Sequence, residues 1–346
     1  YGPNNAQLTI GGDIDAEETL ELIAKYFGPI PRGPEAEKMS PAPAKIERDR
    51  YVTLEDNIHL PAVAMLVPTV YFNHPDEAPL DIAARIMGQG QASLLYQRLV
   101  MTGRAVNVFV SHPCRELACE MSFVVIQNPN SGETLAEMEA AIRATLQEFA
   151  ERGVNQADLD MFKARYESGR IFGMQSVGGK VGGLASSEMF NDDPKFVMED
   201  LKRYAAVTTG DVTRAFRDHI ENQPMVVLSI VPNGRTELAA RAPDFTLPEP
   251  LARDETAPDS PDMRSFTDSF DRSIRPKPGL NPVAELPPVS DLELANGVRL
   301  LAVRNHETPT VSISAIFEVG QRDEPAGKAG LASLTTALMS EATQKR

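Results

Sequence analysis

The sequence predicts an α+β fold in which an antiparallel-rich mixed sheet packs on helices. Between residues 49 and 234, short strand patterns precede a run of consecutive helix patterns, which is typical of a sheet covered mainly on one side. The all-apolar segment 225–231 has the character of a buried strand. Hydrophobic residues make up 42% of the 346 residues and charged residues 24%, so the chain has a globular composition and room for at least two domains.

The charge balance limits the classes of partner. The chain has 34 Lys and Arg against 49 Asp and Glu, a net charge of -15. This excludes nucleic acid or a polybasic membrane anchor as general partners. No apolar run approaches the ~18 residues of a membrane span, and no signal peptide opens the chain. Since the chain starts with Tyr1 rather than Met, we expect further sequence upstream.

The first segment, residues 1–31, predicts a strand at 7–11 followed by a helix. Asp15 is the expected helix cap, with Glu18 placed to reach back to it. The apolar positions have helical spacing: Leu20, Ile23, Ala24 and Phe27. A Gly-Pro pair ends the pattern, and the polar, proline-bearing residues 32–48 predict a connector.

Residues 49–234 predict one α+β unit. Its expected strands are 50–55, 62–67, 106–110, 121–126 and 225–231. Its expected helices are 80–87, 93–100, 135–149, 158–174, 184–190, 195–204 and 211–220. Thr134 and Glu137 form a capping box before the third helix. The glycines in Gly88-Gln89-Gly90 and in 178–183 predict loose joints between helices.

Residues 235–288 predict a linker, since ten of the 27 prolines lie between Arg241 and Ser290. A semi-rigid extended strap and plain disorder both fit this composition. In the remaining residues 289–346, Asn296-Gly297 predicts a hairpin, 311–319 a third strand and 329–339 a helix. Three strands and one helix cannot bury a full core, so we expect the chain to be a piece of a longer protein.

Few residues suggest chemistry by themselves. Cys114 and Cys119 are too few for a thiolate zinc site, and either a cross-strand disulfide or two small buried residues fits them. We expect His112 and Cys114 on opposite strand faces, which excludes a base and nucleophile pair. The segment 178–183 lacks the Lys-Ser/Thr ending of a phosphate loop and follows a helix. No two of the five histidines share a helical turn: His59, His74, His112, His219 and His306.

Several short sequence segments, taken in order along the chain, resemble those of a known protein family. They are Tyr1-Gly2-Pro3-Asn4-Asn5-Ala6, the segments 90–99 (GQASLLYQRL) and 204–212 (YAAVTTGDV), Asp271-Arg272-Ser273 before Pro276-Lys277-Pro278-Gly279, and the segments 296–301 and 320–332. Together they resemble the long bacterial two-domain members of the pitrilysin/insulinase family of zinc peptidases. The resemblance implies five parts. These are the tail of a catalytic half-domain (1–31), a connector (32–48), a non-catalytic half-domain (49–234), an inter-domain linker (235–288) and the start of a second, inactive domain (289–346).

The chain departs from the family at the catalytic motif. Active members carry H-x-x-E-H on a helix, where two histidines bind zinc and the glutamate activates water. The matching positions here are Ser333, Thr336 and Ala337. A hydroxyl and a methyl cannot replace imidazole ligands, and Thr336 cannot accept a proton as a carboxylate does. We therefore expect no catalytic, cofactor-binding or metal-ligating residue in this chain, and zinc in the parent protein is expected upstream of Tyr1.

The resemblance implies a fragment of a periplasmic or exported zinc metalloendopeptidase that degrades or processes peptides or unfolded proteins. On this hypothesis the fragment encloses substrate, is inactive alone, and has the other half of its domain or a partner subunit as neighbour. The alternative is a non-catalytic peptidase-like subunit of the processing-peptidase or respiratory-complex core type. Gly88-Gln89-Gly90 lies where the processing enzyme's non-catalytic subunit has a glycine-rich loop. The residues encoded before Tyr1 discriminate between the two hypotheses.

Overall fold

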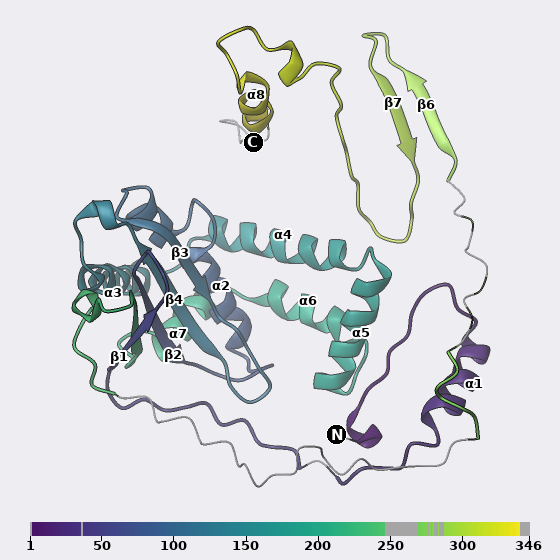
Figure 1. The fold of residues 1–346 in the computed structure, drawn as a ribbon, viewed down its shortest axis with the longest axis horizontal. Coiled ribbons are helices and arrows are strands. Elements are labelled where there is room, and N and C mark those ends of the chain that lie inside the picture. The colour runs from purple at the N-terminus through teal and green to yellow at the C-terminus, as the bar shows by residue number, and fades with distance from the viewer. Residues whose placement is uncertain are drawn as a thin grey trace. The chain divides into compact units, whose positions relative to one another are not determined.

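The computed structural model describes residues 2–35, 37–245, 269–275, 277, 279, 283 and 287–339 (Figure 1). The chain divides into two compact units, residues 1–304 and 305–346. Most of the predicted linker 235–288 lies outside the described residues, namely 246–268, 276, 278, 280–282 and 284–286. None of the described helices is both long enough and apolar enough to cross a bilayer.

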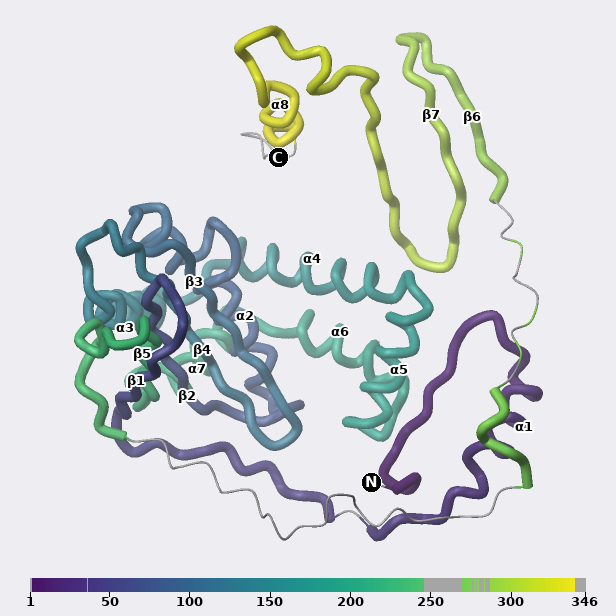
Figure 2. Tube along the Cα trace, in the orientation of Figure 1, coloured from purple at the N-terminus to yellow at the C-terminus, as the bar shows by residue number. Residues whose placement is uncertain are grey.

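The centre of the first unit is a five-stranded mixed sheet with the order β1-β5-β2-β4-β3. Its strands are β1 (Arg50–Asp56), β2 (Ala62–Pro68), β3 (Ala105–Ser111), β4 (Glu120–Gln127) and β5 (Val226–Pro232). Only the β1–β5 pair is parallel. Figure 2 shows β5, the last strand of this sheet along the chain, beside β1 and β2. The predicted α+β class and its antiparallel-rich mixed sheet are confirmed.

Helices cover one face of this sheet. The strand β4 alternates buried Met121, Phe123 and Val125 with partly exposed neighbours, so its two faces differ. The helices that pack on the sheet or on one another are α2 (Glu77–Gly88), α3 (Leu135–Arg152) and α7 (Thr209–His219). Phe149 of α3 and Phe216 of α7 meet edge to face in the core, with ring centroids 4.6 Å apart. A short π-helical segment, Tyr96–Val100, follows α2 and packs on β3.

Three further helices lie beside this core: α4 (Gln156–Gly173), α5 (Val177–Asn191) and α6 (Phe196–Ala206). Figure 1 shows α4 and α6 running side by side, with α5 packed against α6. The predicted joint at 178–183 is wrong, because these glycines lie inside α5. The Ser176 hydroxyl caps this helix by accepting from the Gly179 backbone N–H at 3.0 Å. Each glycine has a helix propensity about 1 kcal/mol less favourable than that of alanine, and the cap acts against this cost.

The joint predicted at Gly88-Gln89-Gly90 has a steric cause. The helix α2 ends at Gly88, where an added Cβ would lie 2.1 Å from Val110 of β3. Only glycine therefore allows the helix end to approach the strand this closely. Two residues later Gly90 has φ +86°, a left-handed conformation that redirects the chain.

The remaining elements are α1 (Ala16–Phe27), the hairpin β6 (Val289–Glu293) and β7 (Arg299–Val303), and α8 (Leu331–Met339) in the second unit. The Asp15 cap and the Asn296-Gly297 hairpin are confirmed. The predicted strands at 7–11 and 311–319 are wrong, since neither segment is a strand. Alternating apolar residues make a strand only where a second strand supplies ladder hydrogen bonds. The predicted domain boundaries, including that at 289, stay predictions.

Candidate functional site

The positions that match the family's zinc motif lie together on α8. Spacings of three and four residues place Ser333, Thr336 and Ala337 on one face of this helix. Thr336 donates its hydroxyl to the backbone carbonyl of Ala332 at 2.9 Å, and Ser333 accepts from Gln321 at 3.2 Å. These groups do not fit zinc, because one face of a helix needs imidazole or carboxylate side chains to ligate it. We derive no catalytic step here.

A second group that could hold a metal surrounds His112. Among the described residues, one ligand atom each of His112, Cys114 and Cys119 lies within 4.8 Å of the others. The two sulfurs form a disulfide, so neither is a thiolate ligand. The predicted separation of His112 from Cys114 is wrong, since Nδ1 lies 3.8 Å from Sγ. Residues two apart share a strand face, and the Cys114–Cys119 bridge holds that face inward.

His112 is fixed by two polar partners on other elements. Its Nδ1 lies 2.6 Å from the Asp81 carboxylate on α2, and its Nε2 lies 2.8 Å from the Thr69 hydroxyl. This order of groups has the connectivity of a hydroxyl, imidazole and carboxylate triad. The His112 side chain is fully buried, however, so substrate cannot reach it. The arrangement is a satisfied polar network that ties β3 to α2.

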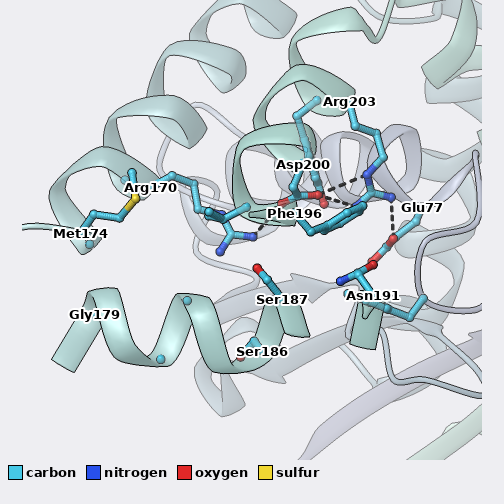
Figure 3. A pocket seen from close by; sticks show the side chains of 17 residues that line it. Glu77, Arg170, Met174, Gly179, Ser186, Ser187, Asn191, Phe196, Asp200 and Arg203 are labelled. Atoms are coloured by element: carbon cyan, nitrogen blue, oxygen red, sulfur yellow. Dashed lines mark hydrogen bonds and ion pairs between the residues drawn. The ribbon is translucent and has the colours of Figure 1, made fainter. Parts of the chain in front are cut away.

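A recess of about 370 Å³ lies between α4, α5 and α6 (Figure 3). Arg203 of α6 is central to its floor. This guanidinium donates to Glu77 at 2.7 Å and to Asp200 at 2.7 Å. Arg170 of α4 donates to the other oxygen of Asp200 at 2.9 Å, and the Tyr166 hydroxyl donates to that oxygen at 2.6 Å. Two carboxylates and two guanidiniums thus balance one another.

Burial controls the protonation of this cluster. It raises the pKa of Glu77, while the hydrogen bond from Arg203 acts in the opposite direction. Burial also raises the pKa of Tyr166, as does its hydrogen bond to Asp200. Burial and the nearby Asp81 charge raise the pKa of Tyr204 in the same way. Both phenols stay neutral at ordinary pH, so the cluster offers fixed dipoles and no free base or nucleophile.

The walls of the recess are small or aromatic. The α5 wall consists of glycines, serines and Asn191, and Figure 3 shows Ser187 pointing toward Phe196 and Asp200. Sequence patterns did not identify this recess, because Glu77 lies 126 positions before Arg203. Only the three-residue spacing of Asp200 and Arg203 on α6 gave a local signal.

The comparisons with known proteins agree with this fold. Residues 1–166 match the family described as the peptidase M16 inactive domain. These residues are therefore similar to the inactive domain of the M16 peptidases. This match confirms that the sequence resembles the pitrilysin/insulinase peptidases. A 235-residue stretch is 24% identical to the zinc protease PqqE of Helicobacter pylori, covering 67% of this chain and 52% of that protein.

Solved structures share this fold. A Helicobacter pylori protease matches with a TM-score of 0.56 at 21% identity, over 64% of this chain and 54% of that one. A peptidase M16 inactive domain from Pseudomonas fluorescens matches with 0.54 at 18% identity, over 64% and 52%. The periplasmic protease PqqL of Escherichia coli matches with 0.52 at 14% identity, over 64% and 24%. The chain spans about half the length of the first relatives it matches.

Proposed function

We propose that this chain is the non-catalytic, substrate-enclosing part of a zinc-dependent metalloendopeptidase of the M16 family. The observation that carries the proposal is the set Ser333, Thr336 and Ala337 on α8, which has the motif's spacing without its imidazoles or carboxylate. The described residues around His112 do not replace that site, because their sulfurs are bridged. The zinc of the parent enzyme is held by residues that precede Tyr1.

The proposal assigns a role to each predicted part. Residues 1–31 end the catalytic half-domain, 49–234 form its non-catalytic partner, and 289–346 begin a second, inactive domain. The sheet and helices of 49–234 provide a rigid wall. In the floor of the recess the carboxylates and guanidiniums pair with one another, so no free acid or base there reacts with the peptide backbone. The substrates are peptides or unfolded proteins. Similarity to a protease described as periplasmic supports a periplasmic location.

The test is hydrolysis of a flexible fluorogenic peptide by the 346-residue chain, with and without added zinc. We expect no turnover above the buffer rate, because no described residue supplies the metal-bound water. Metal analysis after dialysis should find zinc far below one equivalent. Turnover that a chelator abolishes and zinc restores, together with one bound zinc per chain, would overturn the proposal.

The sequence encoded before Tyr1 separates this proposal from the non-catalytic subunit. An intact H-x-x-E-H there, in a longer protein that cleaves peptides, supports the peptidase. A motif that lacks its histidines there supports the partner or scaffold subunit. The Gly88-Gln89-Gly90 turn favours neither, because its close approach to Val110 explains the first glycine sterically.

A further inference from the structure

A small basic recess, here called the arginine pocket, lies on the first unit at the junction of α2 and α4. It is lined by Arg85, Gln89, Ser93, Arg152, Phe162 and Arg165, with Asp158 at its edge. Its volume is about 50 Å³, whereas one water needs about 10–15 Å³ of such space. The pocket therefore has room for a group of the size of a carboxylate.

Besides Arg152 at the end of α3, three elements build the pocket. Arg85 lies in the last turn of α2, and Arg165 lies on α4, which packs against α2. The turn after Gly88 supplies the third side, where Ser93 is buried and donates its hydroxyl to the Gly90 carbonyl at 2.7 Å. The glycine that ends α2 thus also shapes this pocket.

The positive charge of the pocket is only partly balanced. Arg152 has a carboxylate 3.7 Å away, on Asp158. The guanidinium groups of Arg85 and Arg165 form no hydrogen bond or ion pair with any other residue that the structure describes. This is unusual in a chain with 49 acidic and 34 basic side chains, where surface arginines find carboxylates readily. Two of the three guanidiniums are therefore available to an anion from outside the chain.

The surroundings of Arg85 are unfavourable for an isolated positive charge. The side chain is half-buried, and its guanidinium carbon lies 5.9 Å from the centroid of the Phe162 ring. Burial lowers the pKa of Arg85, and the like charge of Arg165 lowers it further. A guanidinium has five N–H donors whose planar geometry matches a carboxylate. A bound anion would satisfy these donors and screen the repulsion between the two arginines.

The rest of the lining selects among anions. Phe162 is buried in the floor, while Met161 beside it is 46% exposed. A ligand with a carboxylate and an adjacent apolar side chain can bond the arginines and also cover Phe162 and Met161. A bare inorganic anion can bond the arginines but leaves these two apolar side chains uncovered.

We propose that the arginine pocket binds the carboxylate of a peptide, namely the C-terminal carboxylate that follows an apolar last residue. The proposal rests on the proposed role of the chain in enclosing peptides, and it adds that one end of the substrate or product is held at the junction of α2 and α4. It assigns the pocket to positioning and not to the chemical step.

The experiment measures binding of acetyl-Phe-Ala-Leu to the 346-residue chain by calorimetry, beside the same peptide as its C-terminal amide. We expect the acid to bind at least about tenfold more tightly, since charge-assisted hydrogen bonds to a guanidinium are lost in the amide. The preference should fall with added salt. Acetyl-Phe-Ala-Glu-amide tests a side-chain carboxylate, and inorganic phosphate tests a bare anion.

Matched variants locate the site. R85Q/R165Q should abolish the preference for the acid, whereas R235Q/R48Q, which changes the net charge equally at two exposed ion pairs, should retain it. The melting temperature of R85Q/R165Q should equal or exceed that of the unchanged chain, because the like-charge repulsion is removed. Equal binding of acid and amide, no binding of either, an unchanged preference in R85Q/R165Q, or phosphate binding as tightly as the peptide would each overturn the proposal. None of these outcomes bears on whether the chain hydrolyses peptides.

Discussion

The phenol of Tyr204 donates its hydrogen bond to the Asp81 carboxylate, which joins α6 to α2. The other oxygen of Asp81 lies 2.6 Å from Nδ1 of His112 on the sheet side. The Tyr204 ring also stacks on Tyr166 of α4, with centroids 3.9 Å apart. One buried tyrosine therefore connects the three-helix layer to the core, and Asp81 passes the connection to the strands.

This connection predicts the effect of removing one hydroxyl. Y204F should lower the free energy of unfolding by about 1–3 kcal/mol, since it leaves a carboxylate oxygen without its donor. Urea denaturation measures the loss. Y96F is the matched control, because Tyr96 packs against the core without a side-chain hydrogen bond among the described residues, and its effect should stay under about 0.5 kcal/mol. Equal losses in both variants would contradict the role of the Asp81 bond.

Local signals explain what could be predicted from the sequence. The Thr134–Glu137 capping box and the Asn296-Gly297 turn each depend on a few adjacent residues, and both occur. The insertion of β5 between β1 and β2 could not be predicted, since Arg50 pairs with Val226 far along the chain. Its apolar run indicated a buried strand but not its neighbours.

The recess and the arginine pocket escaped prediction for a related reason. Both are formed by charged residues that are ordinary in sequence and gain meaning only from helix packing, such as Glu77 with Arg203. The Gly178–Gly183 segment shows the opposite error, because composition suggested a joint and the Ser176 cap produces a helix. The motif-equivalent residues on α8 were identified through the family resemblance of the segment just before them, which is a local signal.

Adjacent carboxyl groups at the start of α2 have opposite pKa shifts and predict opposite pH effects. Burial raises the pKa of Glu77 above its ordinary value of 4.5, so the folded state holds this proton more tightly than the unfolded state. Stability from this group is present below pH 4.5 and is lost as the pH rises through the folded pKa. E77Q cannot titrate. Between pH 4 and pH 7 the unchanged chain should therefore lose stability relative to E77Q, as measured by the free energies of unfolding of the two proteins. A difference that stays constant with pH would contradict the raised pKa of Glu77.

Asp76 should behave in the other direction. Burial acts to raise its pKa, but hydrogen bonds from Arg214 and His219 outweigh it and hold the pKa below 3.8. Stability from this group is present above pH 3.8 and is lost as the pH falls through the folded pKa. D76N should therefore be less stable than the unchanged chain at pH 6, with the difference shrinking toward pH 3. Chemical denaturation at several pH values measures it, and a gap that widens in acid would refute the assignment.

The disulfide closes a short loop, since Cys114 and Cys119 are five residues apart. The entropy of closing a loop of this length predicts a contribution of about 2 kcal/mol to stability. Dithiothreitol should lower the unfolding free energy by that amount in the unchanged chain. C114A/C119A should start lower and not respond to the reductant. A response of both proteins to dithiothreitol would show that the bond does not account for the effect.

The degenerate motif on α8 predicts what restoring its side chains can achieve. S333H/T336E/A337H places two imidazoles one helical turn apart on one face, so this variant should bind zinc in equilibrium dialysis where the unchanged chain does not. The variant should still fail to cleave a flexible peptide, because catalytic zinc sites use three protein ligands and a bound water. S333A/T336A/A337S, which keeps the helix without adding ligands, should bind no zinc. Stoichiometric zinc on the unchanged chain would show that the chain already holds a zinc site elsewhere. Peptide turnover by the histidine variant would show that the chain supplies a third ligand and that the degenerate motif alone makes it inactive.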